Sequence, residues 1–552
     1  MGFLATALFS VFQWRHASCA GTFSAMPRFA AIDVGSNALR LRVVEAACPS
    51  EGSRNRSPKT EPSGSRESSS GWTEIASERA SVRLGSGVFT TGGMTAQSIT
   101  QACTALRDFR QKMTALKVDA YRATATSAVR ESDNRATLVE RARREADIEL
   151  EVIEGVEEAR LVQLAVSRRV RINDRRAMLV DVGGGSTELT ALDRGENTFS
   201  MSLALGTVRL LQNFLQDAST LDASHFELLN EAIDRAIGEA APHIRAMKFD
   251  VMLGTGGNLE TLAQMAPATG KLDFRRAIDV KAARARIVQL AAMTPAQRSA
   301  AFGLRSDRAD TIIPAALTFV KIAELIGLDT IIAPGVGLKE GLLEELVDRF
   351  FRVWDTEGEA ASIIAACVRL GRRYHFDQAH GERVTAFGGQ LFDDFQAIHG
   401  LMARDRLLLR AAAMLHDVGD FVRYEGHHKH SHYIIQNSDI MGLSPNERAV
   451  VANVARYHRK GVPDAAHPNF RDLDRDARAK VRGLAGILRI ADALDREHLG
   501  KVSGVRARVD RARNVAFLTL EGKGERQLEE WSLRMKSDLF RDVYGLDIVL
   551  AR

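Results

Sequence analysis

The chain has 552 residues, of which 45% are hydrophobic and 26% are charged, and its formal net charge is +5. This is the composition of an ordinary globular protein, and the length excludes a single hydrophobic core and predicts three or four domains. The slight basic excess suits a polyanionic ligand only where the cations are clustered. The four cysteines are scattered, form no metal-type pair and predict free thiols in a reducing compartment.

Residues 1–25 are predicted to be an unstructured leader. Their apolar run "GFLATALFSVF" is too short to span a bilayer, and no basic segment precedes it. The alternative is a secretion signal, because "ASCA" resembles a cleavage site. Met26 directly precedes the first strand and suggests a later start of translation. No other segment resembles a membrane span, so we expect a cytoplasmic protein without a membrane partner.

The first predicted domain spans residues 26–171 and alternates strands with helices. It opens with "FAAIDVGSNALRL" (29–41), in which two apolar strands flank a glycine turn. Residues 46–72 are rich in Ser, Gly, Pro and charge, so we predict a disordered surface insertion at the tip of a hairpin. A helix, a strand that enters a loop, and a strand with a glycine turn and a helix start follow at 96–116, 118–132 and 148–161.

The second predicted domain, residues 172–350, repeats this plan. "RAMLVDVGGGSTELTAL" is again strand, turn and strand, and glycine loops follow the strands at 249–262 and 329–347. Alternating strands and helices predict an α/β fold. Asp33 and Asp181 occupy the same place in two Asp-Val-Gly turns, which predicts two similar domains.

The remaining chain changes character. Residues 351–500 have a nearly all-helical pattern and predict an all-α domain. Residues 501–552 contain the strand-like stretch "VRARVDRARNVAFLTLEG", followed by a helix-like and a strand-like segment, and predict a small α+β domain.

The repeated turns predict a two-sided phosphate clamp. A glycine turn after a buried strand presents several backbone N–H groups to one point and lets a ligand approach closely. Hydroxyls can add hydrogen bonds, and the two aspartates can hold a hydrated Mg²⁺. One such turn is as often structural as functional, but two matched turns favour a phosphate cleft. The predicted phosphate-binding residues of the turns are Asp33, Gly35, Ser36, Gly183, Gly184, Gly185, Ser186, Thr187, Gly256 and Gly257.

This arrangement resembles the superfamily of actin, heat-shock chaperones and sugar and acetate kinases, in which two ribonuclease H-like domains flank a phosphate cleft. "AAIDVGSNALRLRVVE", "TATSAVRES", "VIEGVEEARL", "LVDVGGGSTEL" and "GTGGNLETL" together resemble the exopolyphosphatase/guanosine pentaphosphatase family over about 26–350. The resemblance implies Mg²⁺-dependent, processive removal of terminal phosphates from inorganic polyphosphate. In some members the substrate is the 5′-terminal phosphate of guanosine pentaphosphate. The resemblance also implies a homodimer that binds guanosine tetra- or pentaphosphate and no nucleic acid.

Carried over by motif, the resemblance assigns roles to five residues. Glu158, the second glutamate of "VEEAR", would activate the attacking water, and Asp181 and Glu188 would position Mg²⁺ and that water. Asn37 and Arg130 would contact the phosphate chain. These roles fit phosphoanhydride transfer, which needs positioning and charge neutralisation more than covalent chemistry. The alternatives are a first-turn glutamate that only meets the helix dipole, and an arginine in a surface ion pair with the next residue.

A second signal lies in the helical region, which resembles the HD phosphohydrolase family. Imidazole and carboxylate ligands on different helices of a bundle can hold a divalent transition metal. Two interpretations stay open: a second hydrolase for a nucleotide phosphate or phosphodiester, and a metal-bound structural module along the polyphosphate path. Three other histidines, His427, His428 and His432, are expected to be core or surface residues. The predicted ligands are His380, His416, Asp417 and Asp492, with His430 and His458 as candidates for a second metal.

Two rival functions use the same clamp. A phosphotransferase of the acetate- or sugar-kinase type would exclude water and house an acceptor, whereas "GVEEAR" places a base where water is activated. A nonenzymatic sensor of guanosine tetra- or pentaphosphate would bind its ligand and release no phosphate.

Overall fold

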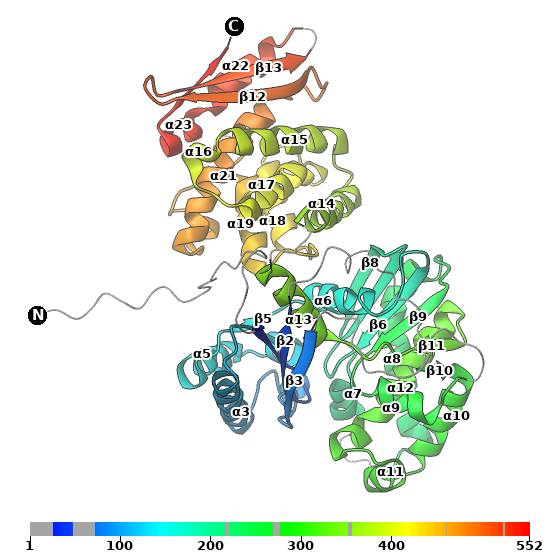
Figure 1. Cartoon of the computed structure of the whole chain (residues 1–552). Coiled ribbons are helices and arrows are strands. Elements are labelled where there is room, and N and C mark those ends of the chain that lie inside the picture. Colours follow the sequence, from blue (N-terminus) through cyan, green and yellow to red (C-terminus); the bar gives the residue numbers. More distant parts are fainter. Residues whose placement is uncertain are drawn as a thin grey trace, which may run out of the picture. The chain divides into compact units, whose positions relative to one another are not determined.

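The structure is a computed structural model that describes residues 26–47, 72–215, 220–268, 276–351, 356–459, 461–522 and 525–551. The predicted leader and most of the predicted insertion lie outside these residues. The chain consists of two compact units, with the boundary between residues 354 and 355 (Figure 1). Within the described ranges, no helix has both the length and the apolar character needed to cross a membrane.

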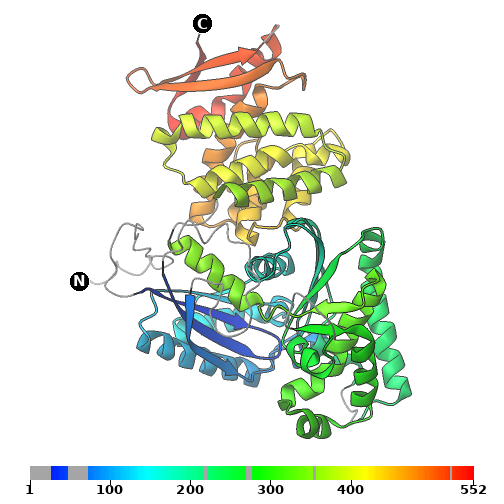
Figure 2. The same ribbon diagram turned by 45° about the vertical axis from the view of Figure 1, so that its right-hand side comes forward.

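Two sheets form the framework of the first unit, and Figure 2 shows the first in blue and the second in cyan to green. The strands are β1 (Arg28–Val34), β2 (Leu39–Ala46), β3 (Trp72–Ala80), β4 (Ala120–Ala125), β5 (Leu150–Val152), β6 (Arg176–Val182), β7 (Thr187–Asp193), β8 (Glu196–Leu203), β9 (Val251–Thr255), β10 (Ala277–Asp279) and β11 (Thr330–Ile332). The strand orders are β3-β2-β1-β4-β5 and β10-β11-β9-β6-β7-β8. The pairs β1/β2 and β6/β7 are antiparallel, whereas β4 and β9 add to them in parallel. The repeated strand-turn-strand motif thus has the same place in both sheets.

Helices cover both faces of each sheet. They are α2 (Val88–Thr91), α3 (Ala96–Ala115), α4 (Ser127–Arg130), α5 (Arg135–Ala146), α6 (Gly155–Ser167), α7 (Thr207–Phe214), α8 (Ala223–Ile244), α9 (Leu259–Met265), α10 (Val280–Ala291), α11 (Pro295–Phe302), α12 (Ser306–Ile326) and α13 (Leu338–Phe350). The outer core of the first sheet includes residues of α3 and α5, and that of the second includes residues of α8, α10 and α12.

A middle layer made of α6 and α13 lies between the inner faces of the two sheets. Leu161 and Val162 of α6 share one core with Leu342 and Leu343 of α13 and with apolar residues of both sheets. In this layer, each helix packs on the sheet of the other predicted domain. Although α6 falls in the first predicted domain, it packs on β7 and β8, whereas α13 from the second packs on β1 and β4. The apolar faces of both helices are covered only when the two sheets come together.

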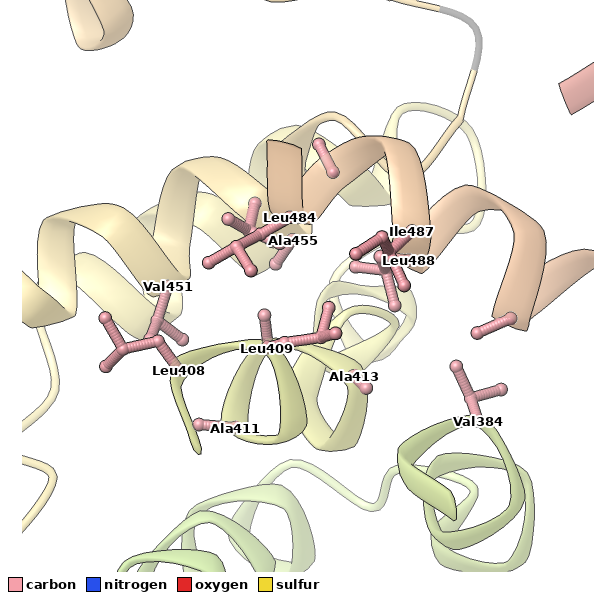
Figure 3. Packing of buried hydrophobic residues seen from close by; sticks show 14 of the residues in the cluster. Val384, Leu408, Leu409, Ala411, Ala413, Val451, Ala455, Leu484, Ile487 and Leu488 are labelled. Carbon is pink, nitrogen blue, oxygen red and sulfur yellow. The ribbon is translucent and has the colours of Figure 1, made fainter. Parts of the chain in front are cut away.

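The second unit is a helical bundle followed by a small sheet. Its elements are α14 (Thr356–Arg373), α15 (Gln378–Asp394), α16 (Gln396–His399), α17 (Ala403–Leu415), η1 (Val418–Phe421), α18 (His427–Gln436), α19 (Pro445–Arg456), α20 (Pro468–Arg471), α21 (Arg475–Ala493), β12 (Val502–Asp510), β13 (Val515–Gly522), α22 (Gln527–Lys536), α23 (Asp538–Tyr544) and β14 (Asp547–Leu550). Figure 3 shows Val384, Leu409, Val451 and Leu488 from four of these helices in one apolar core. The helical stretch and the mixed tail agree with the pattern of the sequence.

Candidate functional site

The strand ends of the first unit direct acidic side chains into the middle layer. On β1, Phe29 belongs to the middle core, and because side chains alternate along a strand, Asp33 points to the same side. On β6, Leu179 belongs to this core, so Asp181 also faces it. The two Asp-Val-Gly turns therefore present their carboxylates toward the layer that contains α6.

Strand register sets a row of polar side chains beside Asp181. Glu188 is its partner on β7, Thr255 is its partner on β9, and Ser202 on β8 is the partner of Glu188. The Thr255 hydroxyl donates to Asp181 Oδ1 at 2.8 Å, and the Ser202 hydroxyl donates to Glu188 Oε1 at 2.9 Å. Hydroxyls of neighbouring strands thus orient both carboxylates.

Glu158 completes a cluster of three carboxylates. It lies in the first turn of α6, and one oxygen each of Glu158, Asp181 and Glu188 lies within 4.8 Å of the others. All three residues are buried. The guanidinium of Arg130 lies 3.7 Å from Glu158 Oε2. Among the described residues, Glu158 Oε2 and Glu188 Oε2 have no hydrogen-bond partner.

Burial makes these carboxyl groups hard to ionise. Desolvation raises the pKa of Asp181 to about 6. Desolvation, together with the charge of Asp181, raises the pKa of Glu188 to about 7. Desolvation and then the charge of Glu188 raise the pKa of Glu158 well above its usual range. A divalent cation would stabilise the ionised forms, and the two unpartnered oxygens fit Mg²⁺, which prefers oxygen ligands.

Several of the predicted glycines allow the turns of the two sheets to touch. A Cβ atom on Gly185 would lie 2.1 Å from Ser127 Oγ, and one on Gly184 would lie 2.8 Å from Ser36 Cβ. Gly256 has a φ of +120°, and its Cβ would lie 2.5 Å from a backbone carbonyl oxygen. Only glycine fits these positions, so close packing accounts for them whether or not a ligand is bound.

Other groups that were predicted to bind phosphate form contacts within the protein. The amides of Gly35 and Gly183 donate to carbonyl oxygens of their own turns at 3.2 and 3.0 Å. The Thr187 hydroxyl donates to the carbonyl of Leu205. Gly257 adjoins the guanidinium of Arg40, 3.4 Å from the position of a Cβ. These contacts shape the turns, and Ser186, also buried, lies at the same tip.

The two predicted chain-contacting residues have different surroundings. Arg130 donates to the Ile153 carbonyl at 2.8 Å and stands beside the carboxylate cluster. It is not paired with the residue that follows it, because Glu131 binds Arg209 at 2.6 Å. Asn37 instead donates to Asp307 Oδ2 at 3.3 Å. The structure brings Arg130, but not Asn37, into contact with the catalytic candidates.

Four polar residues of this site were missed by the sequence reasoning. The roles of Ser202 and Thr255 depend on strand register, which neither motif reveals. Arg40 is the partner of Asp33 on the neighbouring strand β2, and its guanidinium donates to Asp33 Oδ2 at 3.1 Å. Arg209 donates to the Gly185 carbonyl at 2.7 Å and thereby fixes the glycine-rich turn.

The second unit brings the four predicted HD-type ligands together. His380 comes from α15, His416 and Asp417 follow one another at the end of α17, and Asp492 comes from α21. One ligand atom each of His380, His416 and Asp492 lies within 4.8 Å of the others. The carboxylate of Asp417 is 3.5 Å from the imidazole of His416.

The candidates for a second metal are placed differently from the prediction. His458 lies beside Asp417, as expected of a further ligand, but its partner there is His427 rather than His430. Within the described ranges, His430 belongs to no group of potential metal ligands. On α18 these two histidines are three residues apart, so a small difference in helix phase decides which one faces the cluster.

Residues 65–350 match the Ppx/GppA phosphatase family, and residues 364–539 match domain III of Ppx/GppA phosphatases. The chain belongs to the Ppx/GppA phosphatase family.

Similar proteins include the guanosine-5′-triphosphate,3′-diphosphate pyrophosphatases of Aeromonas hydrophila and Vibrio parahaemolyticus, which are 26% and 25% identical to this chain. The alignments cover 77% and 79% of this chain and 79% and 81% of those proteins. The crystal structure of an exopolyphosphatase from Cytophaga hutchinsonii is 25% identical and aligns with a TM-score of 0.51. It covers 58% of this chain and 98% of its own.

Membership of the Ppx/GppA phosphatase family makes the protein a hydrolase that acts on phosphoanhydride bonds. This activity favours the hydrolase over the phosphotransferase and sensor alternatives. The match of the second unit is to domain III of the same family and does not by itself identify an HD-type domain.

Proposed function

We propose that the protein is a Mg²⁺-dependent exopolyphosphatase, which removes terminal phosphates from inorganic polyphosphate and accepts guanosine pentaphosphate as a second substrate. The main support is the buried cluster of Glu158, Asp181 and Glu188 beside two glycine turns. The names of the similar proteins supply the two substrate classes.

Each member of the cluster has a role in this proposal. Asp181 and Glu188 hold Mg²⁺, with their carboxylates oriented by the hydroxyls of Thr255 and Ser202. The ion would neutralise charge on the phosphate chain. Glu158 would accept the proton of the attacking water. Burial raises the pKa of Glu158, which makes its carboxylate a stronger base once it is ionised, and the adjacent charge of Arg130 favours the ionised form.

Arg130 is the cation that adjoins this base. Its guanidinium lies 3.7 Å from Glu158 and is anchored by the Ile153 carbonyl, so it can meet a phosphate group that reaches the cluster. It would stabilise the negative charge that develops on the leaving oxygen of the phosphate chain. Water attacks the terminal phosphorus and the P–O bond to the chain breaks. The products are free orthophosphate and a chain that is one phosphate shorter.

Phosphate release from defined substrates tests the proposal. The purified protein is incubated with Mg²⁺ and either polyphosphate of one chain length or guanosine pentaphosphate, with no added acceptor. We expect orthophosphate and chains shortened from the end, and we expect both to disappear when the ion is chelated. Release from guanosine pentaphosphate alone would contradict the polyphosphate assignment. Transfer that requires an alcohol or carboxylate acceptor would contradict hydrolysis.

A further inference from the structure

The glycine-rich turn between β6 and β7 is held by the first turn of α7. The Thr207 amide donates to the Gly183 carbonyl at 3.0 Å. The amides of Val208 and Arg209 donate to the Gly184 carbonyl at 2.7 and 3.1 Å. The first N–H groups of a helix have no partner within the helix, so these bonds satisfy the helix and fix two carbonyls of the turn.

A third carbonyl of the turn, that of Gly185, is bound by a side chain instead. The next amide of α7, that of Leu210, already donates to the carbonyl of the N-cap residue Gly206 at 2.9 Å. The Arg209 side chain extends back to the turn, where its Nε–H donates to the Gly185 carbonyl at 2.7 Å. Three consecutive carbonyls, those of residues 183–185, are therefore bound from the side of α7.

The opposite side of the turn carries three N–H groups. In a planar trans peptide the N–H points away from the C=O, and the described residues contain no cis peptide bond. Because the carbonyls of residues 183–185 face α7, the amides of Gly184, Gly185 and Ser186 point away from it. Within the part of the chain that the structure describes, these three amides have no acceptor. Consecutive N–H groups on one side of the backbone form a concave site for an anion.

Arg209 is itself fixed by residues that belong to the side of the first sheet. Its Nη2 donates to both carboxylate oxygens of Glu131, at 2.8 and 2.6 Å, and the Ser127 hydroxyl donates to the same carboxylate at 3.0 Å. The guanidinium also lies 4.1 Å from the ring centroid of Phe89, which packs on the outer core of the first sheet. A planar guanidinium can hold two acceptors at once, which the point charge of a lysine does less well.

We propose that Arg209 is a positioning residue, which keeps the amides of Gly184, Gly185 and Ser186 directed at a phosphate group of the substrate. It acts through the Gly185 carbonyl and does not touch the substrate. Without it, the peptide between Gly185 and Ser186 loses the bond that fixes its direction, and glycine allows this peptide to rotate. Donors that are already oriented stabilise the charge of the transition state without reorganisation. The proposal rests on the proposed function, and Glu131 anchors Arg209 in it.

Steady-state hydrolysis of polyphosphate by the full-length protein tests this role. Arg209→Ala should lower kcat by about 10–10²-fold, less than the loss of a donor itself, and should leave KM nearly unchanged. Arg284→Ala is the matched control, because Arg284 of α10 pairs with Glu324 far from the turn in sequence, at 2.8 Å. A raised KM with normal kcat would overturn the proposal, since Arg209 would then bind the chain directly. Equal losses in both variants would also overturn it.

Two milder variants separate positioning from direct binding. Arg209→Lys should recover only a small part of kcat, because one ammonium group cannot hold Gly185 and Glu131 as the guanidinium does. Glu131→Gln should lower kcat as well, since it weakens the anchor of Arg209. Full activity of Arg209→Lys, or tighter polyphosphate binding with normal kcat in Glu131→Gln, would overturn the proposal. Circular dichroism checks folding, and these two variants decide the matter if Arg209→Ala does not fold.

Binding of inorganic phosphate separates this proposal from the proposed function. Free phosphate lacks the further contacts of a chain, so calorimetric titration with Mg²⁺ present should show weaker binding by Arg209→Ala than by the wild type or Arg284→Ala. A wild type that hydrolyses neither polyphosphate nor guanosine pentaphosphate would contradict the proposed function, and this difference in phosphate affinity would still support the role of Arg209. Equal affinities in the three proteins, or no phosphate binding by the wild type, would overturn the positioning role.

Discussion

Glu157 and Glu158 are neighbours in one helical turn but have different surroundings. Glu157 forms an ion pair with Arg160 at 2.7 Å, whereas Glu158 faces two other buried carboxylates. We expect Glu158→Gln to lower the single-turnover rate by about 10²–10⁴-fold, the usual contribution of a positioned base. Polyphosphate affinity should stay equal or rise, because one negative charge leaves the site. Near-normal hydrolysis by this variant, or an equal loss in Glu157→Gln, would reject the assignment of the base.

Asp181 is expected to control the response to Mg²⁺. Asp181→Asn keeps a side chain that can accept the hydrogen bond of Thr255 but removes the charge that would hold the ion. The rate should fall, and saturation should shift to higher Mg²⁺ concentration. Titration of phosphate release with Mg²⁺ measures both effects. An unchanged titration curve would mean that the ion is bound by other residues.

Some residues of the candidate site can be recognised from sequence motifs, whereas others depend on how the strands pair. The three acidic candidates lie in recognisable motifs, and the structure gathers them in one place. Ser202 and Thr255 carry no motif, because their position beside the carboxylates depends on which residues pair across strands. His427 was missed in favour of His430. The two residues are three positions apart and point in similar directions from the helix, so the sequence pattern does not show which one faces the cluster.

Replacing a glycine by alanine should have opposite effects on stability in two elements, the turn between β6 and β7 and the helix α8. A Cβ at Gly185 would meet Ser127 Oγ at 2.1 Å, whereas at Gly238 nothing lies within 4 Å. We expect Gly185→Ala to destabilise the fold by about 1–3 kcal/mol through overpacking. Gly238→Ala, in a helix interior, should stabilise it by about 0.5–1 kcal/mol. Chemical denaturation measures both, and equal shifts in the two variants would contradict the packing argument.

The middle layer contains a buried carboxylate, Glu345 of α13, whose ionisation should influence acid stability. Burial raises the pKa of Glu345, but the charges of Arg160, Arg349 and Arg122 outweigh burial and lower it to about 2. A carboxyl group with a lowered folded pKa stabilises the protein above its unfolded pKa, and this stabilisation is lost as pH falls toward the folded value. The window therefore runs from about 4.5 down to about 2.

The comparison of wild type with Glu345→Gln tests this window. Their difference in unfolding free energy should be constant near neutral pH and should shrink below a pH of about 4.5. Denaturation curves at several pH values give the difference at each. A difference that does not change across the acidic range would show that the ion pairs of Glu345 do not set its stability contribution.

The elements themselves were largely predictable, but their partners were not. The strand-turn-strand motifs, the helical stretch and the mixed tail follow from hydrophobic period and glycine placement. The packing of α6 on β7 and β8, and of α13 on β1 and β4, could not be predicted. Either helix has an apolar face that suits any sheet, and only the three-dimensional arrangement decides which sheet it covers.

For the molecule as a whole, separate hydrophobic cores predict separate unfolding. The largest core of the second unit shares no residue with the cores of the first. We therefore expect two calorimetric transitions rather than one. Gly238→Ala should raise only the transition of the first unit and leave that of the second unchanged. A single transition that shifts as a whole would contradict independent units.

Because α6 and α13 each pack on the sheet of the other predicted domain, the first unit cannot be divided into two independently folding fragments at the predicted boundary. A break between residues 171 and 172 would leave α6 on one fragment and its strands β7 and β8 on the other, while α13 would be parted from β1. Each fragment would expose an uncovered apolar sheet face and aggregate when produced alone. Co-production of both should restore a soluble, active pair, so this unit is suited to fragment complementation in which phosphate release reports reassembly.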